Sequence, residues 1–273
     1  MIMSTYSRSL LRVLLKSVLV GFILINVSFQ VFSQHIVISD SLAANSEQLQ
    51  LKMGVAGIGR MYKYRFGNYG LISSREGWTT INSKTNFWGT KVESSSDQKF
   101  SFVFGNKTTD TAFVNASTKT KIKELQEIQV NEHFSLGDYA LLESTDWLSA
   151  MISLKSNADE SWLLLMNASK GLKAPNFNEG VLSNGSRKII VRAITSNENG
   201  TDKRMFPAKG YELFENGRSL GAVQYFGGGS FGMNKGIVWL SKNNDASTNL
   251  MLGAAMTAIY HFKFSTLAND EWN

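Results

Sequence analysis

The chain has 273 residues and no cysteine, which excludes disulfides, thiolate metal sites, a cysteine nucleophile and a lipid-modified cysteine. Of its 28 Lys and Arg, three lie in residues 1–33, which hold no acidic residue, so 25 basic residues face 22 acidic ones in the rest, a net charge of +3. That balance is ordinary for a protein surface and predicts no nucleic-acid partner. With 43% hydrophobic residues, the chain has enough apolar side chains for a large core.

The first 33 residues have the pattern of a secretory signal peptide. Arg8, Arg12 and Lys16 form a basic start, and an apolar run with few polar interruptions follows at residues 18–32. Ser33 supplies the small residue that a signal peptidase requires, so we expect cleavage after Ser33. The alternative is a retained membrane anchor, but a spanning helix needs roughly 20 predominantly apolar residues and this run is shorter. The pattern predicts export to the periplasm or the exterior of a bacterial cell envelope.

Residues 34–50 form a polar leader that we expect to be disordered. Residues 51–264 are interpreted as one domain, because short runs rich in β-branched and aromatic residues alternate with clusters of Gly, Asn, Ser and Asp. This pattern is typical of many antiparallel strands in a barrel or a sandwich. The predicted strands are 51–66, 86–93, 99–104, 111–115, 119–130, 139–143, 147–155, 161–167, 188–196, 210–215, 218–226 and 236–241, with a long loop at 171–187.

The clearest local prediction is a hairpin over residues 211–226. Asn216 and Gly217 lie between two strand-like runs. Both residue types tolerate the positive φ that a type I′ turn requires, so a tight turn is expected between the two strands.

One segment breaks the β pattern near the C-terminus. Residues 249–262 are good helix formers and apolar on every side, and Asp245 or Ser247 precedes them as a candidate N-cap. A helix that is apolar all round must be buried all round, and this one is too short to span a bilayer. The expected fold is therefore all-β with one buried helix: a closed antiparallel barrel of about twelve strands around a central helix at 248–263, followed by a polar tail at 265–273.

Two stretches carry a resemblance to a known family. Residues 211–223 read YELFENGRSLGAV, and residues 250–262 read LMLGAAMTAIYHF, with the predicted strand 236–241 between them. This order, after many short strands, resembles the tubby-like and phospholipid-scramblase (LURP-one-like) superfamily. The resemblance covers residues 210–264 and implies a twelve-stranded barrel around a central hydrophobic helix.

The chain departs from that family in two respects. Familiar members act on the cytoplasmic side of membranes, whereas this chain starts with an export signal. Scramblases also carry palmitoylated cysteines and a calcium-binding segment, and neither is found here. The resemblance therefore implies the fold more strongly than an activity.

No catalytic residue is predicted. Residues 228–232 read GGSFG, which fits a nucleophile elbow around Ser230, and the surrounding glycines also fit a phosphate-binding loop. Both motifs require a helix directly afterwards, but the strand 236–241 is expected instead. A flexible glycine loop is the preferred interpretation, and a serine hydrolase using Ser230 is kept as an alternative.

No metal site, cofactor or sugar-binding cluster is predicted either. His35, His133 and His261 are isolated, without a second histidine or a carboxylate at helical spacing. His261 lies in the apolar helix, where a hydrogen-bonded core histidine is expected. The six tryptophans, spread from Trp78 to Trp272, are interpreted as core residues.

Two groups of basic residues are candidate ligand-binding sites. In an extended strand, alternate residues share a face, so one group forms a stripe on one side of its strand. The second group lies among Tyr62, Tyr64 and Phe66, and both could bind anionic lipid headgroups or acidic glycans. The alternative is a solvated outer face that protects a strand from edge pairing. The stripe consists of Lys119, Lys121 and Lys123, and the second group consists of Arg60, Lys63 and Arg65.

These observations predict an exported cell-envelope protein that binds or scaffolds and is not an enzyme. The first alternative is a scramblase-like protein with peripheral contact to membrane lipids. The second is an outer-membrane β-barrel, which needs roughly ten-residue strands alternating between polar and apolar positions. Residues 119–130 and 161–167 do not keep that alternation.

Overall fold

The computed structural model describes residues 35–87, 90–106, 110–125, 128–131, 134–136, 140–172, 177–197, 207–227 and 236–271. The predicted signal peptide at 1–33 lies outside these residues.

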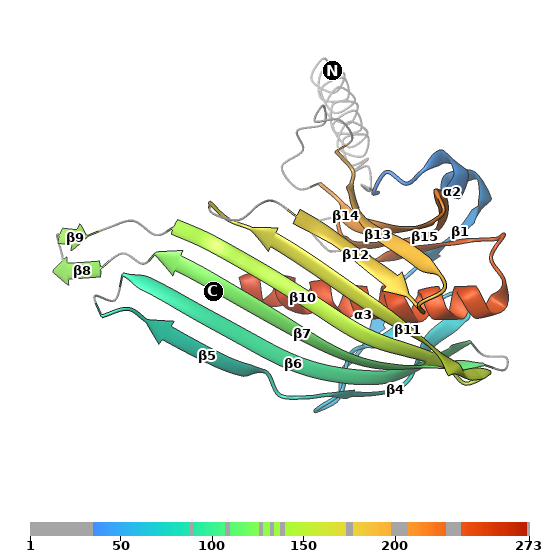
Figure 1. The fold of residues 1–273 in the computed structure, drawn as a ribbon, viewed down its shortest axis with the longest axis horizontal. Helices are drawn as coiled ribbons and strands as arrows, with labels where there is room; N and C mark the ends of the chain where they lie inside the picture. Colours follow the sequence, from blue (N-terminus) through green and yellow to red (C-terminus); the bar gives the residue numbers. More distant parts are fainter. Residues whose placement is uncertain are drawn as a thin grey trace, which may run out of the picture.

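The described chain forms a nearly closed antiparallel barrel of thirteen strands with one C-terminal helix packed against it (Figure 1). The strands follow the order β1-β16-β15-β14-β13-β12-β11-β10-β7-β6-β4-β3-β2, while β5 pairs with β6 outside this path, and β8 and β9 pair with each other. The strands are β1 (Ser46–Gln50), β2 (Lys52–Gly54), β3 (Lys63–Phe66), β4 (Tyr69–Glu76), β5 (Thr80–Thr85), β6 (Lys91–Asn106), β7 (Thr111–Leu125), β8 (Ile128–Asn131), β9 (Phe134–Leu136), β10 (Ala140–Leu154), β11 (Asn157–Lys170), β12 (Phe177–Ser183), β13 (Lys188–Thr195), β14 (Lys209–Glu215), β15 (Arg218–Phe226) and β16 (Ile237–Ser241). The helices are α2 (Asp40–Asn45) and α3 (Ala246–Glu271).

The consecutive strands β1 and β2 form the two opposite edges of the sheet. β1 pairs with β16, and β2, which begins two residues after β1 ends, pairs with β3 at the other edge. Between them, Leu51 is buried and its backbone N–H donates to the carbonyl of Gly236 at 2.9 Å. Counting β1 and β2 as one interrupted strand gives twelve strands, which confirms the predicted barrel.

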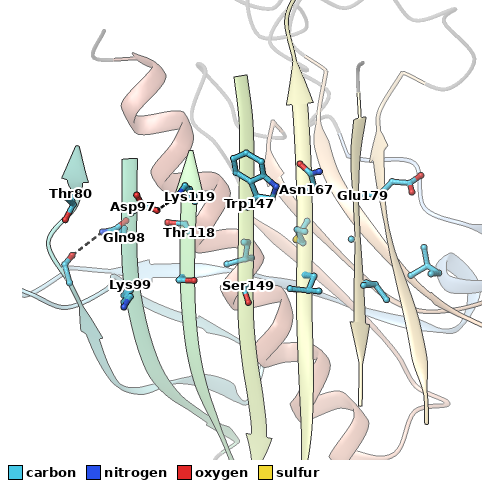
Figure 2. Close-up of a pocket in the computed structure, with 18 of the residues that line it drawn as sticks. Thr80, Asp97, Gln98, Lys99, Thr118, Lys119, Trp147, Ser149, Asn167 and Glu179 are labelled. Atoms are coloured by element: carbon cyan, nitrogen blue, oxygen red, sulfur yellow. Dashed lines mark hydrogen bonds and ion pairs between the residues drawn. The ribbon is translucent and has the colours of Figure 1, made fainter. Parts of the chain in front are cut away.

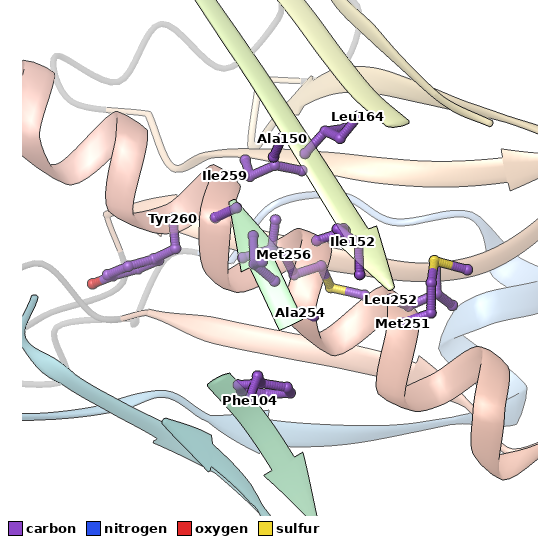
Figure 3. Packing of buried hydrophobic residues seen from close by; sticks show 14 of the residues in the cluster. Phe104, Ala150, Ile152, Leu164, Met251, Leu252, Ala254, Met256, Ile259 and Tyr260 are labelled. Carbon is purple, nitrogen blue, oxygen red and sulfur yellow. The ribbon is translucent and has the colours of Figure 1, made fainter. Parts of the chain in front are cut away.

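Helix α3 fills the interior of the barrel, as its composition requires. Every residue from Leu250 to Lys263 except Gly253 is classed among the buried side chains, and Phe104, Ala150 and Leu164 of the sheet face this helix (Figure 3). A Cβ placed on Gly253 would lie 2.9 Å from a ring carbon of Phe104, so the missing side chain permits the close approach of helix and sheet.

The ends of α3 follow from local hydrogen bonds. One carboxylate oxygen of Asp245 accepts the backbone N–H of Thr248 at 2.7 Å, and the other accepts its hydroxyl at 3.0 Å, so Asp245 is the N-cap. The helix extends to Glu271, past the predicted end at 263. Ser265 and Thr266 continue the helix with hydroxyls bonded to the carbonyl of Phe262.

Residues 35–50 of the predicted polar leader are part of the fold, which corrects the expectation of disorder. It forms α2 and the edge strand β1. Ile36 and Leu42 are buried with Trp239 in a separate small apolar cluster on the outside of the sheet. The buried carboxylate of Glu212 accepts hydrogen bonds from the backbone N–H and the hydroxyl of Ser39. The larger apolar residues of this segment are one short run at 36–38 followed by Leu42 and Leu49 among polar residues, so they show no sustained period, which explains why the segment resembled a disordered leader.

Several strand boundaries also differ from the prediction. The expected strand 51–66 is two strands, β2 and β3, separated by a turn, and the expected loop 171–187 contains β12. Conversely, the runs 86–93 and 99–104 overlap one long strand, β6. Serine-rich stretches such as 94–96 resemble loops in sequence but continue the strand, because both neighbouring strands pair with them.

The predicted hairpin is confirmed. β14 and β15 pair around Asn216 and Gly217, whose φ angles are 49° and 80°. Positive φ at both central residues is the condition for a type I′ turn.

Buried and exposed side chains alternate along β11, which provides a matched pair of substitutions. Leu164 is fully buried opposite Ala150, whereas its neighbour Leu163 is 41% exposed on the outer face. Leu164→Ala should lower the unfolding free energy by about 2–5 kcal/mol because it leaves a cavity beside α3, and Leu163→Ala by less than about 1 kcal/mol. Urea unfolding of both variants measures the difference, and equal losses would contradict the assigned faces.

Candidate functional site

A groove of about 980 Å³ lies on the outer face of the barrel. It crosses the strands from β5 to β13, on the opposite side of the sheet from α3 (Figure 2). We call it the outer groove. Its outward-facing lining consists of Trp78, Thr80, Asp97, Lys99, Ser117, Lys119, Trp147, Ser149, Leu165, Asn167, Glu179, Val181, Lys188 and Ile190.

Strand register places these side chains in two rows. In the first row, neighbours across the strands are Asp97, Lys119, Trp147, Asn167 and Glu179, which lie side by side in Figure 2. The second row is less polar and consists of Ser117, Ser149, Leu165, Val181 and Ile190. Successive residues of a strand point to opposite faces of the sheet. Leu148 and Met166, which lie between the two rows on β10 and β11, are buried on the side of α3, so both rows point outward.

Trp78 stands at one end of the groove and is 93% exposed. It belongs to the connection between β4 and β5, which hydrogen bonds tie to β6. The N–H of Gly77 donates to the carbonyl of Lys99 at 2.8 Å, and the amide of Gln98 donates to the carboxylate of Glu76 at 2.9 Å. Both bonds hold the chain directly before the tryptophan, and the pairing of Thr80 with Asp97 of β6 holds the backbone after it. The indole is therefore presented to solvent from an anchored segment.

The groove contains a polar atom without a partner. The side-chain oxygen Oδ1 of Asn167 is buried and accepts no hydrogen bond from the described residues. A buried acceptor that remains unpaired costs free energy, so a donor in the groove would be bound favourably here.

The predicted lysine stripe lies on one face of β7, and each lysine has a neighbour that reduces its availability. Lys119 forms an ion pair with Asp97 at 3.5 Å, and Lys123 forms one with Glu143 at 3.1 Å. The Lys121 ammonium lies 5.6 Å from the ring centroid of Trp147. The hydrogen bond from Lys123 to Glu143 raises the pKa of Lys123 above its ordinary value.

Only Lys119 of the stripe lines the outer groove. The alternative interpretation, protection of an exposed edge, does not describe this strand, because β7 pairs with β6 on one side and β10 on the other.

The second basic group lies elsewhere on the barrel. Lys63 and Arg65 point outward from β3, and Arg60 lies in the preceding turn. β4 and β6 separate β3 from β7, so the two basic groups do not converge. Two apolar residues accompany this group in the same connection: Val55 is 86% exposed and Ile58 is fully exposed. Neither residue was predicted to belong to a site, although isoleucine and valine between glycines in a polar turn were a detectable signal.

The histidine predicted to belong to the core does so. His261 is 3% exposed, with Nδ1 3.1 Å from the Tyr64 hydroxyl and Nε2 3.1 Å from Oε1 of Glu76. The hydrogen bond with His261, supported by Gln98, holds the pKa of Glu76 below its ordinary value. Burial raises the pKa of Tyr64 far above that of a free phenol, so its hydroxyl remains protonated. The hydrogen bonds from Tyr64 through His261 to Glu76 link the interior helix to the residue that precedes Gly77 and Trp78.

The described residues hold no group of three or more His, Asp or Glu side chains placed to bind a metal ion. Among the same residues, no helix combines the length and apolar character needed to cross a membrane. His133 and Ser230 lie outside the part of the chain that the structure describes.

The interpretation of the tryptophans as core residues is wrong for Trp78, which is 93% exposed and lines one groove together with Trp147. Trp78 lies before β5 and Trp147 in β10, with β6 and β7 between them in the sheet. Their proximity to a common groove depends on strand order and register, which composition and spacing did not reveal.

Comparison with known proteins gives no relative. The chain matches no family model, no curated protein and no solved structure.

The ionised Glu76 predicts an acid-sensitive contribution to stability. Its pKa is lower in the folded than in the unfolded state, so the contribution is complete above the ordinary pKa of 4.5 and is lost as pH falls through the folded-state pKa. Glu76→Gln should cost about 1.5–3 kcal/mol at neutral pH, and its difference from the wild type should shrink on acidification.

Urea unfolding across this pH window measures that difference. The exposed Glu93, which forms a surface ion pair with Lys91, provides a control, since Glu93→Gln should change stability by less than about 1 kcal/mol. A Glu76→Gln difference that stays constant with pH would refute the assigned role of the carboxylate.

Proposed function

We propose that the protein is an exported cell-envelope binding protein without enzymatic activity, and that its ligand occupies the outer groove. The observation that carries the proposal is the exposed Trp78 beside a large groove that also contains the unpaired Oδ1 of Asn167. Large exposed aromatic residues next to a concave surface are characteristic of binding sites.

The filled interior supports an external site. α3 occupies the space in which an open barrel would hold a ligand, and the side chains around it form one apolar cluster. A ligand of this protein therefore binds on the outer face or at the rim. Export is supported by the basic start and the apolar run of residues 1–33.

Distant membership of the tubby-like and phospholipid-scramblase superfamily is part of the proposal. It is supported by the barrel, by the buried helix and by the hairpin whose residues carry the resemblance. We do not extend the family's cytoplasmic activities to this chain, because its N-terminal sequence favours export.

A ligand screen by thermal unfolding tests the groove. A bound ligand at 100 times its Kd adds about 2.7 kcal/mol to the unfolding free energy, which raises the melting temperature. From a panel of sugars, fatty acids, nucleotides and short peptides, at least one class should stabilise the wild type. Trp147→Ala should lose that shift. A panel without any effect, or a full shift in Trp147→Ala, would count against the proposal.

A second function, peripheral contact with anionic membranes, is favoured by one observation. Val55 and Ile58 project into solvent beside Arg60, Lys63 and Arg65. Exposed apolar side chains next to cations can insert into a bilayer interface while the cations contact acidic headgroups. We call these five residues the basic tip. This is the scramblase-like alternative, without a proposed lipid-transport step.

Cell fractionation with a salt-wash series distinguishes the two functions. In both cases the product of the full-length chain should begin at Gln34. If the basic tip binds membranes, part of the product sediments with them and is released by high salt, and Lys63→Glu with Arg65→Glu reduces that part. Lys84→Glu, on the exposed strand β5, is the control and should have no effect. A fully soluble wild type leaves groove binding alone, and an N-terminus other than Gln34 contradicts the predicted cleavage.

The two remaining alternatives have less support. Along β7 the outward positions include Lys119, Lys121 and Lys123, while the inward ones near α3 are apolar, the reverse of the polarity expected for an outer-membrane barrel. For a serine hydrolase, no described residue adds to the sequence argument about Ser230.

A further inference from the structure

We propose that the ligand of the outer groove is an oligosaccharide that lies across the strands. This inference rests on the proposed function, because it names the class of ligand that the groove binds. It is carried by the shape of the groove, by the two tryptophans and by the polar groups between them.

The shape of the groove requires an elongated ligand. Its lining runs from β5 through β6, β7, β10, β11 and β12 to β13. Neighbouring strands lie about 4.8 Å apart, so this path measures on the order of 25–30 Å. A single sugar ring would cover only a fraction of it, whereas a chain of several rings follows its whole length.

The chemistry along this path alternates between flat apolar surfaces and hydrogen-bonding groups. Trp78 offers an exposed indole and Trp147 a half-buried one, with the Lys121 ammonium 5.6 Å from its ring centroid, and the CH face of a sugar ring is an apolar plane of similar width. Between and beside them, Lys119, Asn167 and Glu179 point outward in one row (Figure 2). Sugar hydroxyls both donate and accept, so one ring can bond to the ammonium, the amide and the carboxylate.

The unpaired oxygen of Asn167 lies in the middle of that row. Oδ1 has almost no exposed surface, so a rotation of the Asn167 side chain is needed to bring this unpaired acceptor to a sugar hydroxyl, at no cost to another protein bond of Oδ1. Asn167 is next to Trp147 across β10 and β11, so a ring stacked on the indole carries its hydroxyls towards the amide.

Two other ligand classes fit less well. An extended peptide gains affinity from a sheet by adding a strand at an edge, but β6 to β13 are paired on both sides, so a peptide across them would bury unpaired amides. An acyl chain would remove water from Asp97, Lys119 and Glu179 without offering any hydrogen bond. Sugar rings satisfy both the apolar and the polar part of the lining.

Isothermal titration calorimetry of the full mature chain tests the inference with defined probes. These are cellohexaose, maltohexaose, chitohexaose and an oligogalacturonate, so that neutral, acetylated and acidic glycans are separated. At least one should bind, and Trp78→Ala and Trp147→Ala should each weaken it by about tenfold or more. Phe87→Ala, which removes an equally exposed aromatic ring outside the groove, should leave the affinity unchanged.

The outcomes separate this inference from the proposed function. If no glycan binds, but dodecanoate or a short peptide binds with an affinity that depends on Trp78, the groove is a binding site and the glycan inference is overturned. If no probe depends on Trp78 or Trp147, both the inference and the proposed function are overturned. Glycan binding that Phe87→Ala weakens as strongly as Trp78→Ala would also overturn the placement in the groove. Because Trp78 is almost fully exposed, its removal should not affect folding, and unchanged thermal unfolding of Trp78→Ala verifies this.

Discussion

The burial of α3 is the constraint on which the rest of the structure depends. A helix whose residues from Leu250 to Phe262 are apolar on every side has no face for water, so the sheet must enclose it. The strands supply an inner lining of aromatic and aliphatic side chains, and the run from β1 to β2 carries the two edges around the helix. The consequence for function is that the interior is a packed core, and recognition is left to the outer surface.

The same alternation that builds the core also builds the groove. On β10, Leu148 points to α3 and Trp147 points outward, and on β11 Met166 and Asn167 divide in the same way. A shift of one residue in register would exchange the two faces, so the packing of the core against α3 also fixes the rows of the groove. The chain from Tyr64 through His261 to Glu76 adds a second link, because Glu76 lies directly before the segment that presents Trp78.

Part of the outer face of the sheet is covered and part is open, and the N-terminal segment provides some of the cover. Residues 36–45 cover the outside of β14, β15 and β16 with Ile36 and Leu42, and the buried carboxylate of Glu212 anchors them through Ser39. The outer face from β6 to β13 has no such cover among the described residues, and the outer groove lies there. A segment that resembles a disordered leader in sequence therefore helps to decide which part of the sheet is open to a ligand.

The sequence by itself determined the features that depend on local chemistry. Asn216 and Gly217 specified the hairpin, the residues before the helix limited its N-cap to Asp245 or Ser247, and the uniform apolar composition of α3 specified the closed barrel around it, since each signal lies within a few residues. Only the tertiary structure decided the docking of the leader, the merging of predicted strands into long ones, and the meeting of Trp78, Trp147 and Asn167. These depend on which strands pair and in what register, and register is set by the summed packing of the whole sheet on α3 and by no single stretch of residues.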